Sequence, residues 1–283
     1  MIREWTRADT RGVLRVPVAD DDKYSRGVVA LRTGSADYPG AAVLGVEAAW
    51  RAGAGYVRYV GGAAAAVLAR RPETVATSDT GRTRVGAWVI GSGMDASRRD
   101  PGELAALQHI LAGSAPVVVD AGALDLAREA DAPLVLTPHA GELRRLREQL
   151  GLEVREDSPE SASARAEARM AEAVETARML EAVVLLKGAR TLIAAPDGQV
   201  IEVSGAPAWL ATAGTGDVLA GIVGTLLASS PERPRVEVAA SAAWLHGLAG
   251  AIASGARDGA PGHPIVAMDV AEALPAAIAE LLS

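Results

Sequence analysis

Short runs of apolar residues alternate along the chain with longer stretches in which apolar positions recur every three or four residues. The short runs are rich in Val, Leu and Ile and end at a Gly, Pro or polar residue, as strands buried on both faces do. The longer stretches are rich in Ala and Leu and are typical of amphipathic helices. We expect strands at 28–31, 56–60, 87–90, 117–120, 134–137 and 183–186, and helices at 41–51, 63–70, 103–111, 142–150, 162–180, 217–228, 236–253 and 270–282.

Strands and helices that alternate in this way predict an α/β fold with a parallel sheet covered by helices on both faces. A hairpin is expected at 191–195 and 200–203, which flank Pro196-Asp197-Gly198. No segment has the composition of a linker, so we expect one domain over 1–283, a single-domain three-layer sandwich with a mostly parallel sheet. Residues 1–26 are interpreted as an N-terminal arm or edge element, and 155–169 as a charged surface helix.

The composition narrows the possible functions. The 283 residues are 49% hydrophobic and 22% charged, which is enough apolar material for a large core. A net charge of −7 argues against a general nucleic-acid binder. The absence of Cys excludes disulfides and thiolate metal sites, and four His make a histidine-rich metal site unexpected. The charged N-terminus has no signal-peptide pattern, and no run of about 18 uninterrupted apolar residues suggests a membrane span. We therefore expect a cytoplasmic protein.

Gly214 and Gly216 lie among small residues that lead directly into the helix predicted at 217–228. Glycines there let several backbone N–H groups point the same way, and a helix start adds a positive partial charge. The segment is therefore a candidate anion hole for a phosphoryl group, with Asp217 at its edge. The alternative is an ordinary helix start, with Thr215 as the N-cap and Asp217 complementing the helix dipole. Neither lysine lies in a Walker A pattern.

A glycine turn follows the strand predicted at 87–90. Gly91-Ser92-Gly93-Met94-Asp95-Ala96 matches G-x-G-x-x-A, the pattern of a Rossmann dinucleotide site. It follows the third predicted strand, however, and Asp100-Pro101 delays the next helix. We therefore favour a turn that lets a ligand approach the backbone.

Two other segments combine a strand end with chemistry-bearing side chains. In Thr137-Pro138-His139-Ala140-Gly141-Glu142, Thr137 or His139 could cap the next helix, or His139 could contact a ligand. In 187–191, Lys187 and Thr191 could meet a nucleotide, or the segment could be a plain turn. His246, inside a predicted helix, is expected to be half-buried and hydrogen-bonded.

Ligands bind parallel α/β sheets outside the carboxyl ends of the strands. We therefore expect several strand ends to meet at one edge of the sheet, namely 34–35, 91–93, 120, 137–139 and 187–188.

At these residues the chain resembles the ADP/ATP-dependent NAD(P)H-hydrate dehydratase family of the ribokinase-like superfamily. The resemblance covers about 23–282, and the order and spacing of the matching segments make it specific. The segments are Gly34-Ser35-x-x-Tyr38-Pro39-Gly40-Ala41, Arg51-Ala52-Gly53-Ala54-Gly55, Gly91-Ser92-Gly93-Met94, Val119-Asp120-Ala121-x-Ala123-Leu124, Leu136-Thr137-Pro138-His139-x-Gly141-Glu142, Leu186-Lys187-Gly188, Ala213-Gly214-Thr215-Gly216-Asp217-Val218-Leu219-Ala220-Gly221 and His246-Gly247-Leu248-Ala249.

The resemblance implies an ADP-dependent repair enzyme, a lyase that restores NADH and NADPH from the S-epimers of their hydrated forms, NADHX and NADPHX. It implies that the ring hydroxyl is phosphorylated and phosphate is then eliminated, so that ADP yields AMP and phosphate. Bacterial members typically use ADP and eukaryotic members ATP. Mg²⁺ would bridge the nucleotide phosphates, and no protein ligand to the metal is assigned.

The resemblance also implies roles for particular residues. Asp217 would orient the hydroxyl and accept its proton, with Gly214, Thr215 and Gly216 stabilising the phosphoryl group. Since it stands at a helix N-terminus, we expect Asp217 to be only a weak base. The residues expected to contact the hydrated dinucleotide are Ala41, Gly93, His139 and Asp217. Those expected to contact the adenine nucleotide are Lys187, Gly188, Ala189, Arg190, Thr191 and Gly216.

Three segments depart from the family pattern. Gly-Pro-Gly-Leu is Gly91-Ser92-Gly93-Met94, Asp-Ala-Asp-Ala-Leu-Asn is Asp120-Ala121-Gly122-Ala123-Leu124-Asp125, and Asn-Pro is Ala206-Pro207. We expect these departures to change secondary polar contacts, and the first to loosen its turn. The epimerase domain often fused ahead of this one is absent, so a separate epimerase is the expected functional partner. The resemblance further implies a homo-oligomer, often a tetramer.

Three alternatives stay open at this point. A ribokinase-like kinase of a small molecule, such as a vitamin precursor, would use the same Asp217 but release a phosphorylated product. A catalytically silent regulator would bind nucleotide without turnover. A Rossmann oxidoreductase is the third.

Overall fold

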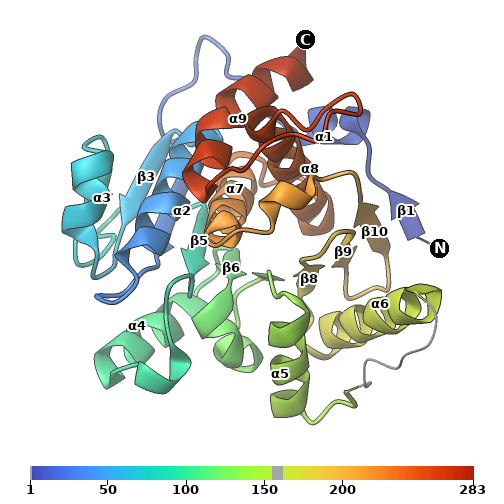
Figure 1. Ribbon diagram of the computed structural model, residues 1–283. Coiled ribbons are helices and arrows are strands. Elements are labelled where there is room, and N and C mark those ends of the chain that lie inside the picture. Colours follow the sequence, from blue (N-terminus) through green and yellow to red (C-terminus); the bar gives the residue numbers. More distant parts are fainter. Residues whose placement is uncertain (1, 155–161) are drawn as a thin grey trace.

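The computed structural model describes residues 2–154 and 162–283 (Figure 1). These residues form one sheet with the strand order β1-β10-β9-β8-β7-β6-β5-β2-β3-β4. Its strands are β1 (Ile2–Glu4), β2 (Val28–Arg32), β3 (Tyr56–Tyr59), β4 (Val75–Ala76), β5 (Ala87–Ile90), β6 (Val117–Val119), β7 (Leu134–Leu136), β8 (Val183–Leu186), β9 (Thr191–Ala194) and β10 (Val200–Val203). β8, β9 and β10 pair antiparallel, and the other neighbours pair parallel.

Helices connect most of the parallel strands. They are α1 (Arg7–Val13), α2 (Pro39–Arg51), α3 (Ala64–Arg70), α4 (Pro101–Leu111), α5 (Ala140–Leu150), α6 (Ala162–Met179), α7 (Thr215–Ser229), α8 (Arg235–Ser254) and α9 (Ala267–Leu282), with 3₁₀ segments η1 (Ala96–Arg98), η2 (Ala121–Glu129) and η3 (Ala208–Leu210). Local sequence explains their ends. Asp100 caps α4 ahead of Pro101, and Gly151 ends α5 in the left-handed conformation.

Both faces of the sheet are buried. In β6, Val118 belongs to one hydrophobic cluster, whereas Val117 and Val119 belong to another. Because successive side chains of a strand point to opposite faces, the two clusters lie on opposite sides of the sheet. The first cluster is completed by α1, α2, α3, α7, α8 and α9, and the second by α4, α5, α6 and η2. In Figure 1 the orange and red helices accordingly lie on one side of the sheet and the green and yellow helices on the other. The result is a three-layer sandwich.

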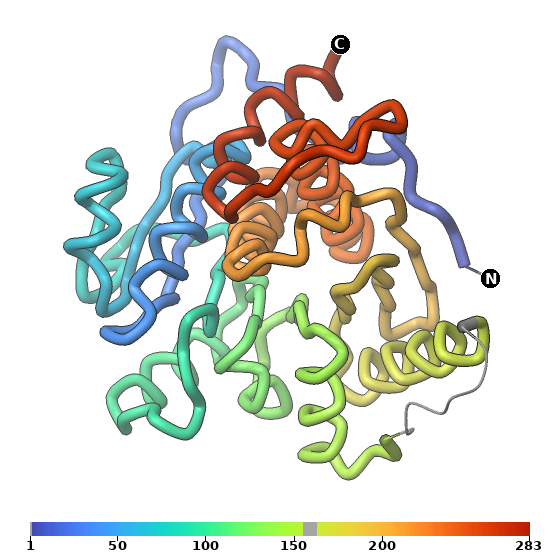
Figure 2. The backbone as a smooth tube through the Cα atoms, viewed as in Figure 1, coloured from blue at the N-terminus to red at the C-terminus, as the bar shows by residue number. Residues whose placement is uncertain are grey.

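The predicted α/β architecture, the mostly parallel sheet and the hairpin at β9 and β10 are confirmed. The predicted arm is more ordered than its sequence suggests: β1 pairs with β10, and α1 packs against α8 and α9. Figure 2 traces this arm in blue from the marked N-terminus. The segment η2 was not predicted. Of the surface helix expected at 155–169, residues 155–161 lie outside the described residues, and 162–169 are helical.

Within the part of the chain that the structure describes, α8 is the one helix long and apolar enough to cross a membrane by length and composition. However, 67% of its apolar window is buried inside the protein. Burial between α7, α9 and the sheet accounts for its composition, since a helix in this position needs apolar residues around most of its circumference.

Candidate active site

The carboxyl ends of five neighbouring strands meet at one edge of the sheet, as predicted. β2, β5, β6, β7 and β8 are mutually parallel. Beyond the strands the backbone keeps pairing: the N–H of Gly34 donates to the carbonyl of Ser92 at 2.7 Å, and the N–H of Lys187 donates to that of Pro138 at 2.8 Å. This continued pairing sets Lys187 beside His139.

A buried carboxylate, Asp120, organises this edge. It follows β6 and is 2% exposed. The Ser92 hydroxyl donates to Oδ2 at 2.8 Å, while the Thr137 hydroxyl and the Lys187 ammonium donate to Oδ1 at 2.8 and 3.0 Å. Three neighbouring strand ends therefore converge on one side chain. No role was predicted for Asp120, although an acid directly after a buried strand of a parallel sheet is a signal that the sequence contains.

Lys187 lies between acidic groups and the start of α7. Its Nζ is 3.7 Å from Oε2 of Glu142, in addition to its bond with Asp120. A side chain added at Gly216 would lie 3.3 Å from Nζ, so the ammonium group is next to the first turn of α7. Burial by itself lowers the pKa of Lys187, but the Asp120 and Glu142 carboxylates outweigh it and raise the pKa above its usual value. The group is therefore a cation at neutral pH.

The first turn of α7 is preceded by a glycine with φ of +90°, Gly214, which occupies the N-cap position without a side-chain cap. A Cβ there would lie 2.7 Å from the Leu44 side chain, so both conformation and space favour glycine. Thr215 is not the N-cap that the alternative interpretation expected. It is the first helical residue, and its hydroxyl donates to the carbonyls of Leu210 and Thr212 at 2.9 and 3.0 Å. The helix start thus carries backbone N–H groups with no side-chain cap, which suits it to bind an anion.

Asp217 lies in this first turn. Burial, followed by the charge of Asp120, raises its pKa from 3.8 to about 7, and the nearby Lys187 opposes the rise only in part. The expectation that Asp217 is a weak base was therefore wrong. The helix dipole does favour its anion, but the loss of solvation inside the fold is larger. A carboxylate with a pKa near 7 is well matched to accept a proton at neutral pH.

A cavity of about 450 Å³ opens beside this turn. Most of the residues predicted to contact the nucleotide line this cavity, namely Lys187, Gly188, Ala189, Thr191 and Gly216. The rest of its wall includes His139, His246 and the apolar side chains of Leu210 and Leu219. Arg190 is the exception, because its exposed guanidinium forms an ion pair with Glu202 and does not line the cavity. We refer to this space as the nucleotide-side cavity.

A second cavity, of about 610 Å³, is lined by Gly93, Tyr38, Met94, Glu142 and Arg145 among others. Gly93 packs closely against Ala41, because a Cβ at Gly93 would lie 2.4 Å from that of Ala41. Two of the residues predicted to contact the substrate, Ala41 and Gly93, therefore lie side by side. The volume lies within the range of small-molecule sites.

His139, the third predicted substrate residue, lines the nucleotide-side cavity instead. It caps α5: Nδ1 accepts from the N–H groups of Gly141 and Glu142 at 3.0 and 3.3 Å, and Glu142 accepts from the His139 N–H. The capping interpretation of this segment is therefore confirmed. Its imidazole remains half exposed, so the cap leaves the side chain accessible to a ligand.

A family model described as NAD(P)H-hydrate dehydratase matches residues 29–263. The chain is 36% identical over 255 residues to the ADP-dependent (S)-NAD(P)H-hydrate dehydratase of Neisseria meningitidis serogroup B, which is 84% of this chain and 80% of that protein. The chain belongs to the NAD(P)H-hydrate dehydratase family.

Other relatives support the same family and the fold. The bifunctional NAD(P)H-hydrate repair enzyme Nnr of Mycobacterium leprae is 40% identical over 263 residues, 90% of this chain and 51% of that protein. The chain thus spans about half the length of the bifunctional relatives it matches. The ADP/ATP-dependent NAD(P)H-hydrate dehydratase from Bacillus subtilis, co-crystallised with ATP and Mg²⁺, superposes with a TM-score of 0.81 at 27% identity over 99% of both chains. The fold is ribokinase-like, as predicted.

Two departures from the dehydratase pattern have local explanations. Ser92, where the family usually has proline, supplies one of the three donors to Asp120, so it tethers the turn that it was expected to loosen. Gly122, where the family usually has aspartate, lies against Met94: a Cβ would be 2.2 Å from the Met94 carbonyl oxygen. Any side chain there would require this backbone to move.

Two further changes have different consequences. Asp125, in place of asparagine, forms an ion pair with Arg99 at 2.8 Å. Ala206, in place of asparagine, lines the nucleotide-side cavity and leaves that part of its wall apolar.

Proposed function

We propose that this chain is an ADP-dependent (S)-NAD(P)H-hydrate dehydratase that converts hydrated NADH or NADPH to NAD(P)H, with ADP giving AMP and phosphate. Its dehydratase relatives support the reaction class. The observation that carries the proposal is the position of Asp217, a carboxylate with a pKa of about 7 in an uncapped helix start beside the Lys187 ammonium group.

The nucleotide-side cavity fits an adenine nucleotide. Its apolar walls, which include Leu210 and Leu219, can cover a base, while Lys187 and the N–H groups at the start of α7 face the position suited to phosphates. The turn formed by Gly188, Ala189 and Thr191 completes the wall. Because Arg190 points elsewhere, we assign its side chain no contact and leave only its backbone in the nucleotide site.

Asp217 would act on the ring hydroxyl of the hydrated nicotinamide. The carboxylate accepts the hydroxyl proton as the oxygen attacks the β-phosphorus of ADP, and the bond to the AMP oxygen breaks. Phosphoryl transfer passes through a loose transition state, so positioning and charge stabilisation by Lys187 and the α7 N–H groups dominate. The lone pair of the ring nitrogen then expels phosphate, and a proton leaves the adjacent carbon to restore the double bond.

Mg²⁺ fits the donors available at this edge. The described residues contain no group of three or more His, Cys, Asp and Glu placed to hold a metal ion. Asp120 and Glu142 nevertheless offer carboxylate oxygens on either side of Lys187. Mg²⁺ commonly binds one or two carboxylates together with substrate phosphates. We therefore propose a Mg²⁺ carried by the nucleotide phosphates, which would neutralise part of their charge.

A spectroscopic assay tests the proposal. The purified protein is mixed with hydrated NADH, Mg²⁺ and either ADP or ATP, and both the dihydronicotinamide absorbance and free phosphate are followed. Recovery of absorbance with one phosphate released per turnover is expected, and ADP is the expected donor. Stable phosphorylated product without phosphate release would instead indicate a kinase. Nucleotide binding with no turnover would indicate a silent regulator.

Three further expectations stay predictions: a homotetramer, functional partnership with an epimerase that supplies the S-epimer, and a cytoplasmic location. Molecular mass in solution, measured by light scattering, tests the first. The second is tested by adding an NAD(P)H-hydrate epimerase to a mixture of both epimers. Full conversion with it and half conversion without it is the expected result.

A further inference from the structure

Arg145 is a cation in the wall of the second cavity, and the proposed chemistry does not use it. It lies on α5 and lines that cavity, which has a volume of about 610 Å³. Its side chain is exposed, and no residue of 2–154 or 162–283 forms a hydrogen bond or an ion pair with its guanidinium. The planar guanidinium group carries several N–H donors whose arrangement matches the oxygens of a phosphate. This part of the wall can therefore hold an anion.

The acidic side chains of the same wall already have partners. Asp95 accepts hydrogen bonds from the N–H and the hydroxyl of the serine two residues further on, at 2.9 and 2.7 Å. Asp125 forms its ion pair with Arg99, and Glu142 faces the ammonium group of Lys187. Among the described residues that line the cavity, the charge left without a partner is thus positive. Such a wall favours an anionic ligand.

The face of α5 toward the cavity fixes where this cation lies. Glu142, Arg145 and Gln149 all line the cavity and are three and four residues apart, so they follow one face of the helix. Arg145 is about 4.5 Å beyond Glu142 along the helix axis. Its side chain leans toward the helix start, because a Cβ at Gly141 would lie 3.9 Å from its Nη1. The guanidinium is therefore close to the end of the cavity that Glu142 forms.

Glu142 marks the border between the two cavities. It lines the second cavity, whereas Lys187, 3.7 Å from its carboxylate, lines the nucleotide-side cavity. The nucleotide-side cavity has its own polar atom without a partner among the described residues, Nε2 of His246, which is buried and not half-buried and hydrogen-bonded as expected. Arg145 lines only the second cavity, so it is placed for the hydrated dinucleotide and not for ADP.

The order of groups in the substrate indicates which of them meets Arg145. The ring hydroxyl has to lie at the border of the cavities, where it can reach both Asp217 and the phosphates of ADP. From the ring, the molecule continues through a ribose, the diphosphate, a second ribose and adenine. In NADPHX a further phosphate is attached to the second ribose. A cation one helical turn from the border is closer to the diphosphate than to that far ribose.

We propose that Arg145 binds the diphosphate of the hydrated dinucleotide and so holds the substrate while its ring lies at Asp217. This inference rests on the proposed dehydratase function and adds a substrate contact to it. The diphosphate does not change during the reaction, so the contact is equally strong in the ground state and the transition state. Its loss should therefore raise KM and leave kcat nearly unchanged. NADHX and NADPHX should be affected alike, because both contain the diphosphate.

The test compares R145M and R145K with the parent enzyme at saturating ADP. Methionine keeps much of the length of the side chain and removes the charge, whereas lysine keeps the charge and loses the planar donors. We expect R145M to raise the KM for hydrated NADH and for hydrated NADPH by about 10–50-fold, with kcat within about threefold. We expect R145K to stay within about fivefold of the parent KM. The Kd for ADP, measured by calorimetry, should change less than twofold in both variants.

Arg144 offers a matched control. It is the preceding residue on α5 and is also exposed, but it lines neither cavity. R144M should leave both KM values within about twofold of the parent. An equal rise of KM in R144M and R145M would show that α5 acts only through its overall charge and would overturn the proposed contact.

Two other results would also contradict the proposal. KM values unchanged in R145M would remove Arg145 from the substrate site, and a rise confined to hydrated NADPH would place it at the phosphate of the far ribose. A parent enzyme without dehydratase activity would instead overturn the proposed function. The Kd for hydrated NADH, measured without ADP in the parent and in R145M, would still test the contact in that case.

Discussion

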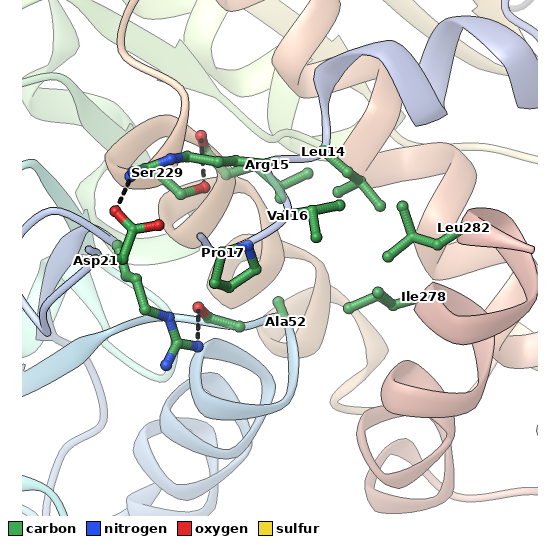
Figure 3. A pocket seen from close by; sticks show the side chains of 12 residues that line it. Leu14, Arg15, Val16, Pro17, Asp21, Ala52, Ser229, Ile278 and Leu282 are labelled. Carbon is green, nitrogen blue, oxygen red and sulfur yellow. Dashed lines mark hydrogen bonds and ion pairs between the residues drawn. The ribbon is translucent and has the colours of Figure 1, made fainter. Parts of the chain in front are cut away.

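The two ends of α7 face two different cavities. At its start, Lys187, Gly216 and His139 surround a space of about 450 Å³ into which polar groups converge. At its end, about 21 Å away for a 15-residue helix, lies the smaller pocket of Figure 3, about 120 Å³, formed mainly by side chains such as Leu14, Val16, Ile278 and Leu282. None of the predicted site residues lines that pocket. The apolar side chains around the smaller pocket serve to pack neighbouring helices, whereas a catalytic site needs charged groups that converge on one point.

One carboxylate lies near each end of α7, and the surroundings shift the pKa values of the two in opposite directions. Asp21 lines the pocket of Figure 3. Hydrogen bonds from the backbone of Val18 and the side chain of Ser25, with the charge of Arg15 nearby, lower the pKa of Asp21. At the other end, burial and the charge of Asp120 raise the pKa of Asp217 to about 7. Both are acids near a helix terminus. The difference in their surroundings makes Asp21 a stable anion that orders a loop and Asp217 a base.

The largest expected effect comes from removing that base. D217N keeps the shape of the side chain but cannot accept the hydroxyl proton, so kcat should fall by about 10³-fold. The Kd for ADP, measured by calorimetry, should stay within a few fold. D21N, which changes an acid in the other pocket, serves as the control and should leave kcat unchanged. Near-normal turnover by D217N would remove Asp217 from the mechanism.

The pH dependence should show the second largest effect. With a pKa of about 7, Asp217 is half ionised at pH 7 and about 1% ionised at pH 5, so kcat should drop by about 50-fold between these two pH values. The raised pKa also has a stability consequence, since the folded state binds this proton more tightly than the unfolded state. The stabilisation from Asp217 is thus complete below pH 4 and lost as pH rises through 7. D217N should therefore have a higher Tm than the parent at pH 8, a difference that disappears near pH 4. A flat rate profile from pH 5 to 8 would contradict the raised pKa.

Removing the cation should have the third largest effect. K187M deletes a hydrogen-bonding ammonium group at the proposed phosphate position, and charge-assisted bonds of this kind are worth about 1.5–3 kcal/mol. The KM for ADP should rise by about 10–100-fold, measured by initial rates at saturating hydrated NADH. The variant also leaves Asp120 without its charged partner, so a thermal melt is needed to confirm folding. An unchanged KM for ADP would place the phosphates elsewhere.

The effect of S92A should be smaller. It removes one of three donors to Asp120 and leaves those of Thr137 and Lys187 in place. We expect kcat to fall less than tenfold and the free energy of unfolding to fall by about 1 kcal/mol, measured by urea denaturation. S92P, the residue usual in the family, should behave in the same way. A loss as large as that of D217N would mean that Ser92 acts directly on substrate.

The smallest effect on activity is expected at the other end of α7. Leu226 lines the pocket of Figure 3 and is 2% exposed. L226A should lower the free energy of unfolding by about 2–5 kcal/mol and leave kcat within about twofold at a temperature where the protein is folded. A kcat reduced as much as in D217N would show that the two ends of the helix are coupled.

Much of the fold and part of the site follow from the sequence alone. Apolar runs such as 117–119 and periodic stretches such as 217–228 predict β6 and most of α7, because local pattern reports which faces are buried. Gly214 marks a turn that few other residues could form. The topological rule for parallel sheets then places Lys187 and His139 at one edge. Each of these features depends only on residues that are neighbours in the chain, or on a rule that all parallel strands follow.

Tertiary structure alone decided the chemistry at that edge. From the sequence, Asp217 was a weak base at a helix start, whereas in the fold it is buried near Asp120, 97 positions earlier, and its pKa rises to about 7. The donors to Asp120 come from three other strand ends. A pKa depends on lost water and on charges within a few ångströms. Neither quantity has a local signature, because both arise only when distant segments pack together.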